Sequence, residues 1–162
     1  MNAEERREFV RAHRTAVLGY SRKEDGPAMS IVYYTTEPDG TILVSTMGER
    51  TKAKACARLG KASLCVLDEQ WPLTYLQVYC DAKVETGDDA NVDLAMRIAG
   101  VMAGKPMPEE VRPMIAEGVR RENRVVLRLT PYATFETPPR HVYSTDDLNE
   151  NLVHDLGTSL PW

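Results

Sequence analysis

The clearest pattern along the chain is an alternation of apolar and polar positions in residues 74–85. Every second position is apolar, namely Leu76, Val78, Cys80, Ala82 and Val84. Because successive side chains of a strand point to opposite faces, this pattern predicts a long strand over residues 73–86 with one core face. The other face carries Tyr75, Gln77, Tyr79, Asp81 and Lys83. It indicates either contact with a ligand or a second subunit, or ordinary half-exposed strand residues.

Shorter apolar runs predict five further strands, over residues 14–21, 27–36, 41–46, 61–68 and 123–137. The polar residues 22–26 join the first two as a hairpin, and Glu37-Pro38-Asp39-Gly40 is a strong turn signal before the third. We expect these three to form an antiparallel meander. The strand over residues 61–68 is apolar on both faces, which favours a central position. Pro131 predicts a bulge or an edge in the last strand.

Helical periodicity predicts four helices, over residues 3–13, 50–59, 88–103 and 111–121. Phe9 and Val10 form the apolar contact of the first, and Gly60 is expected to end the second. Asp88 and Asp89 are expected to cap the third. The last two helices and their link contain four methionines, Met96, Met102, Met107 and Met114. Flexible methionines at helical spacing are more often part of a core than of a ligand cavity, so we expect them to fill the core.

Length and composition indicate one soluble globular domain. The chain has 162 residues, 43% of them hydrophobic and 27% charged. We expect a domain over residues 1–137, followed by an extension, 138–162, whose recurring apolar residues pack on the domain or on a partner subunit. A net charge of −4 argues against a nucleic-acid partner. Without a membrane-length apolar run or a signal-peptide pattern, a cytoplasmic location without membrane attachment is the expectation.

Cysteine and histidine positions do not indicate a metal or redox centre. Cys56, Cys65 and Cys80 lack zinc-knuckle and Cys-x-x-Cys spacing, and no two histidines have helical metal spacing. We therefore expect reduced, core-filling thiols and no metal. Walker, Rossmann and Gly-x-Ser-x-Gly motifs are also missing from the sequence. This combination favours a protein in which a bound cofactor carries the chemistry.

The start of the helix predicted over residues 50–59 carries positive charge where negative charge is usual. Arg50, Lys52 and Lys54 crowd it, although a helix N-terminus has a partial positive charge and normally attracts Asp or Glu. Free backbone N–H groups at such a position bind anions, most simply a phosphate. The arrangement predicts a phosphate site; the alternative is a solvated helix face without a ligand.

Two motifs resemble those of a known superfamily. Arg50-Thr51-Lys52-Ala53-Lys54 is similar to the basic-x-Lys-x-basic run that holds the cofactor phosphate in the pyridoxamine 5′-phosphate oxidase-like split β-barrel proteins. Met29-Ser30-Ile31-Val32-Tyr33 is similar to their strand that lies along the isoalloxazine ring. Together with the order of elements, the resemblance covers residues 14–130. It is greatest to the flavin/deazaflavin oxidoreductases, which use FMN or coenzyme F420.

The resemblance implies a mainly β fold with α (α+β), a six- to seven-stranded antiparallel split β-barrel with flanking helices. It also implies a homodimer with two cofactors at the subunit interface, which would explain the face of Tyr75, Gln77 and Tyr79. By carry-over, the phosphate-binding residues are Arg50, Thr51, Lys52 and Lys54, with Ser45 and Thr46 nearby. The residues expected near the ring are Ser30, Val32 and Tyr33, and those expected at the cofactor from the interface face are Gln77 and Tyr79.

The implied function is hydride transfer between bound F420 or FMN and a small unsaturated or conjugated substrate. Tyr33, Tyr75, Tyr79, His141 or solvent could deliver the accompanying proton, so no catalytic residue is assigned. Pyridoxamine-phosphate oxidases proper end in a basic segment that binds substrate phosphate, whereas this chain ends in an acidic, apolar tail. Vitamin B6 oxidation is therefore not expected. The alternative function is a non-enzymatic F420 or FMN carrier or binding protein on the same fold.

Overall fold

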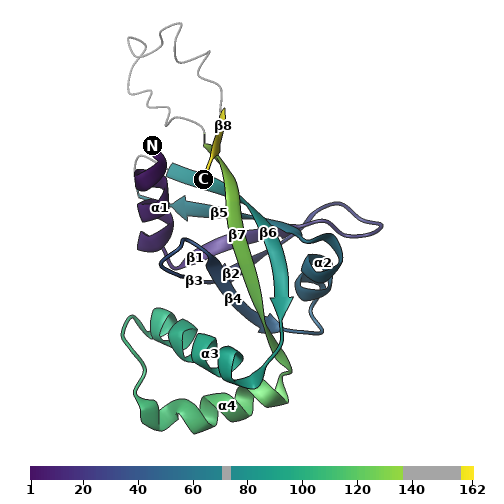
Figure 1. The fold of residues 1–162 in the computed structure, drawn as a ribbon, viewed down its shortest axis with the longest axis vertical. Coiled ribbons are helices and arrows are strands. Elements are labelled where there is room, and N and C mark those ends of the chain that lie inside the picture. Colours follow the sequence, from purple (N-terminus) through teal and green to yellow (C-terminus); the bar gives the residue numbers. More distant parts are fainter. Residues whose placement is uncertain (71–73, 137–157) are drawn as a thin grey trace, which may run out of the picture.

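An antiparallel sheet curls into a half-barrel and forms the centre of the protein (Figure 1). The computed structural model describes residues 1–70, 74–136 and 158–162. In these residues eight strands are present: β1 (Thr15–Tyr20), β2 (Ala28–Tyr33), β3 (Thr35–Thr36), β4 (Ile42–Met47), β5 (Lys61–Asp68), β6 (Thr74–Glu85), β7 (Arg124–Glu136) and β8 (Thr158–Pro161). Their order in the sheet is β2-β1-β5-β6-β7-β4-β3, and β8 also pairs with β7. The predicted central position of β5 is confirmed.

The sheet closes on itself at Tyr34. The strands β2 and β3 lie at opposite ends of the strand order, although Tyr34 alone separates them in the sequence. The segment 28–36 therefore joins the two ends of the sheet. The Tyr34 side chain is 2% exposed, and its hydroxyl donates a hydrogen bond of 2.6 Å to the carbonyl oxygen of Val10 in α1 (Ala3–Ala12). The predicted fold class, a split β-barrel with flanking helices, is confirmed.

The interior of the half-barrel follows the alternation of β6. Leu76, Val78 and Cys80 are fully buried there. They pack with side chains of the other strands, including Leu18, Val44, Leu64, Leu127 and Leu129. Each such fully buried aliphatic side chain contributes roughly 1.5–3 kcal/mol to stability. This core makes the sheet the rigid frame on which the helices and turns are held.

Helices pack on the sheet in two places, α2 (Thr51–Leu59) against the main core and α3 (Asp88–Ala103) against the opposite face of β4 and β7. α2 buries Ala53, Ala55 and Cys56 and ends at Gly60, whose N–H donates to the Cys56 carbonyl over 2.9 Å. α3 and α4 (Arg112–Arg121) pack against each other, and α3 contacts β4 and β7 (Figure 1). A 3₁₀ turn, Glu109–Val111, precedes α4. A second small core, Leu43, Leu94, Val126 and the half-buried Ile98, joins α3 to the sheet.

Three sequence predictions need correction. The expected three-stranded meander is wrong, although its two turns are present. The strand predicted over residues 27–36 breaks at Tyr34 into β2 and β3, and β4 pairs with β3 and β7 instead of β2. The N-cap of α3 is Gly87, which has no side chain to act as a cap, so Asp88 and Asp89 lie in the first turn and act through their charge. Core filling is wrong for Met102 and Met114, which are 55% and 67% exposed.

The bulge predicted at Pro131 is confirmed. Tyr79 pairs with Ala133 and Cys80 with Pro131, so Tyr132 is the extra residue in β7. Proline has no N–H to donate to a neighbouring strand, which suits an interruption of the ladder. The pairing of β7 with β4 ends at Leu129, before the bulge, and its pairing with β8 begins at Ala133, after it. The bulge therefore marks the point at which β7 changes partner.

The end of the predicted C-terminal extension lies against the N-terminal helix. Residues 137–157 are outside the described part of the chain, but β8 pairs with β7. The Arg6 guanidinium donates to the Pro161 carbonyl over 2.7 Å, and that of Arg7 donates to the Trp162 carbonyl over 3.1 Å. Arg7 also lies over the Trp162 ring, 5.8 Å from its centroid. These contacts hold residues 158–162 on the half-barrel of the same chain.

Candidate functional site: the start of α2 and the outer face of the sheet

The first turn of α2 has unused hydrogen-bond donors. Its N-cap, Arg50, makes no side-chain capping bond, and the first turn contains no acidic residue. The N–H groups of Ala53 and Lys54 bind the Arg50 carbonyl, at 3.0 and 3.2 Å, whereas those of Thr51 and Lys52 have no acceptor in the described residues. Two outward N–H groups and the helix dipole together favour an anion at this position.

The cations around this turn are only partly neutralised. Lys54 forms an ion pair of 2.8 Å with Glu49, but neither Arg50 nor Lys52 has a carboxylate partner within the described part of the chain. Burial, followed by the nearby Arg50 charge, lowers the pKa of the half-buried Lys52 below its ordinary value. A bound phosphate would supply the missing negative charge. Arg50, Thr51, Lys52 and Lys54, the residues predicted to bind phosphate, occupy the N-cap and the first turn of α2.

Ser45 and Thr46, predicted beside the phosphate, occupy opposite faces of β4. Thr46 is 7% exposed and points to the core side, whereas Ser45 is half-buried on the other side. The Ser45 hydroxyl accepts a hydrogen bond of 3.2 Å from Arg124, which also pairs with Glu122 at 2.7 Å. Sequence reasoning missed Arg124. It lies 79 positions beyond Ser45, and only the pairing of β4 with β7 brings them together.

β2, predicted to lie along a cofactor ring, has one open edge. It pairs with β1 and with no other strand among the described residues, so backbone groups along its second edge are unpaired. Val32 is 7% exposed and belongs to the core, and any contact it makes with a ligand would come from its backbone. The Ser30 hydroxyl is buried without a hydrogen-bond partner in the described segments. Tyr33 is half-buried on the face away from the core.

Gln77 and Tyr79 lie on the outer sheet face, the side of β2, β1, β5, β6 and β7 opposite the core. Strand register places one row across this face, Ile31, Val17, Cys65, Gln77 and Phe135, and a second row, Met29, Gly19, Ser63, Tyr79 and Ala133. The Tyr79 ring stacks on that of Tyr132, with centroids 6.4 Å apart. Two strands separate Gln77 and Tyr79 from β2. A single chain therefore does not gather all the predicted ring contacts at one point.

The candidate proton donors in the described residues lie on two separate strands, β2 and β6. Tyr33 and Tyr79 are half-buried on the outer sheet face, and Tyr75 is paired with Leu67 in the β5–β6 register. His141 lies outside the described residues. The cysteines are free, with Cys56 and Cys80 buried and Cys65 half-buried, and burial raises the pKa of each thiol. Raised thiol pKa values disfavour thiolates at neutral pH and therefore nucleophilic or metal-binding roles.

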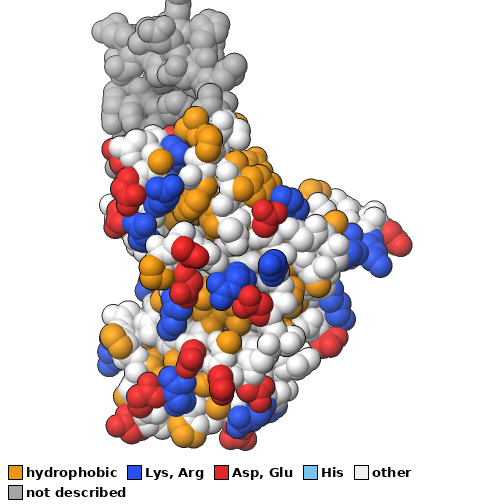
Figure 2. Space-filling view, in the orientation of Figure 1, with side chains coloured by type: hydrophobic (Ala, Val, Ile, Leu, Met, Phe, Trp, Pro, Cys, Tyr) orange, Lys and Arg blue, Asp and Glu red, His pale blue; other side chains and the backbone are white. Residues whose placement is uncertain are grey.

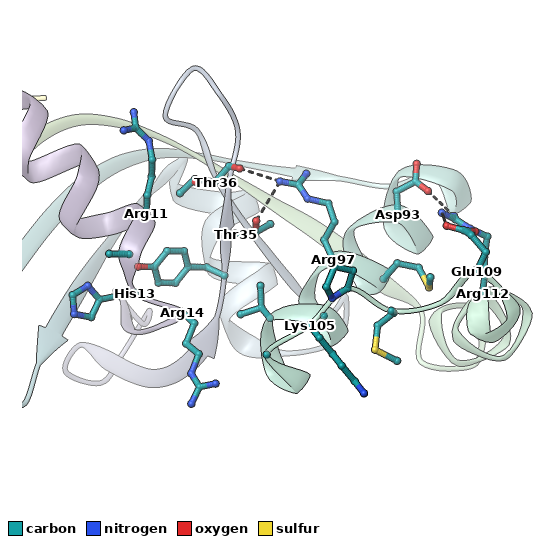
Figure 3. A pocket seen from close by; sticks show the side chains of 18 residues that line it. Arg11, His13, Arg14, Thr35, Thr36, Asp93, Arg97, Lys105, Glu109 and Arg112 are labelled. Carbon is teal, nitrogen blue, oxygen red and sulfur yellow. Dashed lines mark hydrogen bonds and ion pairs between the residues drawn. The ribbon is translucent and has the colours of Figure 1, made fainter.

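Two hollows lie near these elements. The smaller, about 410 Å³, is bounded by the β1–β2 turn and α2, and Thr51 and Lys54 are the predicted site residues that line it. The larger, about 930 Å³, lies between the end of α1, β3 and the α3–α4 pair (Figure 3). It contains none of the predicted cofactor residues. Met96 and Met107, two of the four methionines considered above, line the larger hollow.

Comparison with known proteins adds a family and a set of similar folds. The family model described as pyridoxamine 5′-phosphate oxidase matches residues 3–137. No curated protein has a significantly matching sequence. A conserved hypothetical protein from Mycobacterium tuberculosis has a similar structure, with a TM-score of 0.71 and 21% identity, over 83% of this chain and 82% of that one.

Two other solved structures show how widely the fold is used. An F420 reductase is 16% identical, with a TM-score of 0.58, over 75% of this chain and 88% of its own. A heme storage protein from Vibrio cholerae is 15% identical, with a TM-score of 0.57, over 80% of this chain and 89% of its own. At such identities the likeness concerns the fold. Because the family model itself matches most of the sequence, we conclude that this chain belongs to the pyridoxamine 5′-phosphate oxidase family.

Proposed function

We propose that the protein is an oxidoreductase that binds FMN or coenzyme F420 by its phosphate at the start of α2, at the interface of a homodimer. The observation that carries the proposal is the pair of uncompensated cations, Arg50 and Lys52, beside the two unused N–H groups of α2. Both cofactors contain a phosphate that would satisfy these groups. Family membership and the similar fold of an F420 reductase support a flavin or a deazaflavin.

The open edge of β2 suits the ring of either cofactor. A planar heterocycle with alternating donors and acceptors is recognised well by backbone N–H and C=O groups, which do not depend on side-chain identity. The unpartnered Ser30 hydroxyl adds one buried polar group on this strand. β2 also contacts β4, the strand that leads into α2. A cofactor held by its phosphate at α2 could therefore extend toward β2.

A second copy of the chain would complete the site. Met29 and Ile31 are 73% and 76% exposed on the outer sheet face, and Leu67 and Tyr132 are 40% and 46% exposed. Figure 2 shows hydrophobic side chains gathered over the upper part of the sheet, whereas charged side chains are interspersed over α3 and α4. Contiguous exposed apolar surface commonly marks a protein interface. In a twofold dimer through this face, Gln77 and Tyr79 of one chain could approach the cofactor of the other.

The chemistry proposed is hydride transfer to or from a small unsaturated or conjugated substrate. The cofactor, when bound, supplies the hydride chemistry, and the protein supplies position and exclusion of water. In this scheme Arg50 and Lys52 hold the phosphate end, and the covered outer sheet face excludes solvent.

A second candidate is a carrier or binding protein without turnover. The heme storage protein of similar fold supports it, since it shows that this architecture also serves storage. The two candidates differ in one measurable respect. An enzyme oxidises or reduces a member of a panel of conjugated substrates with the bound reduced cofactor in repeated turnovers, whereas a carrier binds the cofactor and shows no turnover.

The test is a spectroscopic titration of the protein with FMN and, separately, with F420. We expect one cofactor to bind tightly and to show a shifted absorption band. Arg50→Ala should weaken its binding roughly tenfold or more, because charge-assisted hydrogen bonds to phosphate contribute about 1.5–3 kcal/mol. Arg120→Ala, which removes an exposed cation from α4, is the matched control. Equal affinity of wild type and Arg50→Ala for both cofactors would exclude the proposed phosphate site.

A further inference from the structure

The larger cleft has walls from three parts of the chain. Its volume is about 930 Å³, within the range of pockets that hold small organic ligands. One wall is the end of α1 with the two residues that join it to β1, a second is β3 with Tyr34 before it, and the third is α3 with its link to α4 (Figure 3). Because no residue of the α2 site lines it, the cleft is a separate feature of the molecule.

The cleft lining is positively charged although the protein has a net charge of −4. Five cations line it, Arg11, Arg14, Arg97, Lys105 and Arg112, against two carboxylates, Asp93 and Glu109. Arg112 binds both of these carboxylates, each at 2.6 Å. Both acidic groups of the lining are therefore already engaged by one arginine. Figure 3 shows all three at the same end of the cleft.

Two more of the cations are neutralised by residues outside the lining. Arg11 pairs with Glu4 and Glu8 on its own helix, at 3.1 and 3.2 Å. Arg97 pairs with Glu37 at 2.5 Å and donates to the Thr36 carbonyl at 3.0 Å, so it ties α3 to β3 across the cleft. These arginines shape the walls and have little capacity left for a ligand.

Arg14 and Lys105 remain. Neither side chain has an ion pair or hydrogen bond in the described residues, and they belong to opposite walls. In Figure 3 both side chains extend toward the lower edge of the view, Arg14 on the left and Lys105 nearer the middle. The backbone of Lys105 is fixed, since its N–H donates to the Gly100 carbonyl over 3.1 Å. Both residues are exposed, so the lining carries two positive charges that no carboxylate of the described residues neutralises.

The cleft lining also contains apolar side chains. Met96, 7% exposed, and the half-buried Met107 and Val101 line the α3 wall, and the Tyr34 ring lines the opposite wall. Methionine adapts its shape to irregular ligands and contacts aromatic rings favourably. The cleft lining therefore combines apolar side chains with two cations that have no ion-pair partner in the described residues.

We propose that this cleft binds a small organic dianion with an apolar body, either a phosphomonoester or a dicarboxylate. The anionic group lies between Arg14 and Lys105, and the apolar body lies on Met96 and Met107. Asp93 and Glu109 set this direction, because they disfavour an anion at the far end of the cleft. The site is independent of the cofactor proposed at α2.

The test uses phenyl phosphate and phthalate as probes, with uncharged benzamide as the neutral probe. Binding is followed by calorimetry and by the methyl NMR signals of Met96 and Met107, assigned through Met→Leu variants. We expect both anions to saturate and to shift these signals. Arg14→Gln and Lys105→Gln should each weaken binding roughly tenfold, and Arg120→Gln should leave it unchanged. A preference for one anion identifies the headgroup class.

Measurements in Arg50→Ala separate the two sites. Signal shifts that persist in Arg50→Ala and disappear in the double variant Arg14→Gln/Lys105→Gln support the cleft. Loss in Arg50→Ala alone would assign the probes to α2 and overturn the proposal. Equal binding of benzamide, unchanged affinity in the double variant, or no shift at millimolar probe would overturn it as well. The double variant is expected to bind FMN or F420 with the same affinity as wild type. The cofactor site at α2 and the anion site in the cleft can therefore be tested separately.

Discussion

Tyr34 donates its hydroxyl hydrogen to the Val10 carbonyl oxygen over 2.6 Å, and so ties the point at which the barrel closes to α1. Burial raises the pKa of this phenol, so it stays a donor throughout the neutral range. Tyr34→Phe keeps the ring but leaves the buried carbonyl without this partner. We expect the free energy of unfolding in urea to fall by about 1–2 kcal/mol. Tyr20→Phe, at a partly buried tyrosine whose hydroxyl makes no hydrogen bond within the described residues, should change it by less than about 0.5 kcal/mol.

Lys52 should destabilise the ligand-free protein. Its pKa is lowered in the folded state by burial and by Arg50, from an ordinary value of 10.5. The unfolded chain then binds more protons between the lowered pKa and 10.5, so stability should rise with pH through that window. We expect Lys52→Met to raise the thermal midpoint at pH 7 and to remove this rise. The cofactor should no longer raise the thermal midpoint of this variant. A midpoint below that of wild type in the ligand-free protein would contradict the prediction that the Lys52 charge is destabilising.

The outer sheet face should hold a dimer together. Ile31→Glu puts a charge into the proposed interface, where an unpaired buried charge costs several kcal/mol. We expect light scattering to show a dimer for wild type and a monomer for Ile31→Glu. Met114→Glu is the matched control, since Met114 is similarly exposed but lies on α4. A monomeric wild type at micromolar concentration would count against the interface and against the shared cofactor site.

Gly40 and Gly118 should respond oppositely to alanine. Gly40 has φ of +87°, and a Cβ there would lie 3.0 Å from the Trp162 indole nitrogen. Gly40→Ala should therefore lower the free energy of unfolding by about 2 kcal/mol or more, through strain and displacement of Trp162. Gly118 lies in α4 with open space around it, and Gly118→Ala should raise stability by roughly 0.5–1 kcal/mol. Chemical denaturation of both variants checks the contrast.

Local patterns predicted most of the elements, because helix and strand periods depend on neighbouring residues alone. The boundaries of β6 and α2 and the bulge at Pro131 came from such patterns. The break at Tyr34 was missed, since residues 27–36 read as one continuous strand. It follows from barrel closure, which depends on pairings between β4 and β7 that no short segment encodes.

The candidate site was predictable in part for the same reason. Arg50, Thr51, Lys52 and Lys54 are sequence neighbours, and their charge conflicts with the helix dipole in a way that the sequence alone shows. Arg124 could not be found beside Ser45 without the strand register. The cleft with Arg14 and Lys105 was not expected, because its walls come from residues about ninety positions apart. Met96 and Met107 were considered as cavity residues, but a core role was favoured.

Closure of the sheet at Tyr34 also fixes when the α2 site can form as the chain is synthesised. β4 leads directly into α2, and its long partner is β7, which begins at Arg124. A chain that stops before residue 124 leaves β4, among the strands that the structure describes, with the two-residue β3 as its only sheet neighbour. The turn that carries Arg50 and Lys52 then has no frame to hold it. The chain should consequently become able to bind the cofactor phosphate only late in synthesis, when β7 pairs with β4.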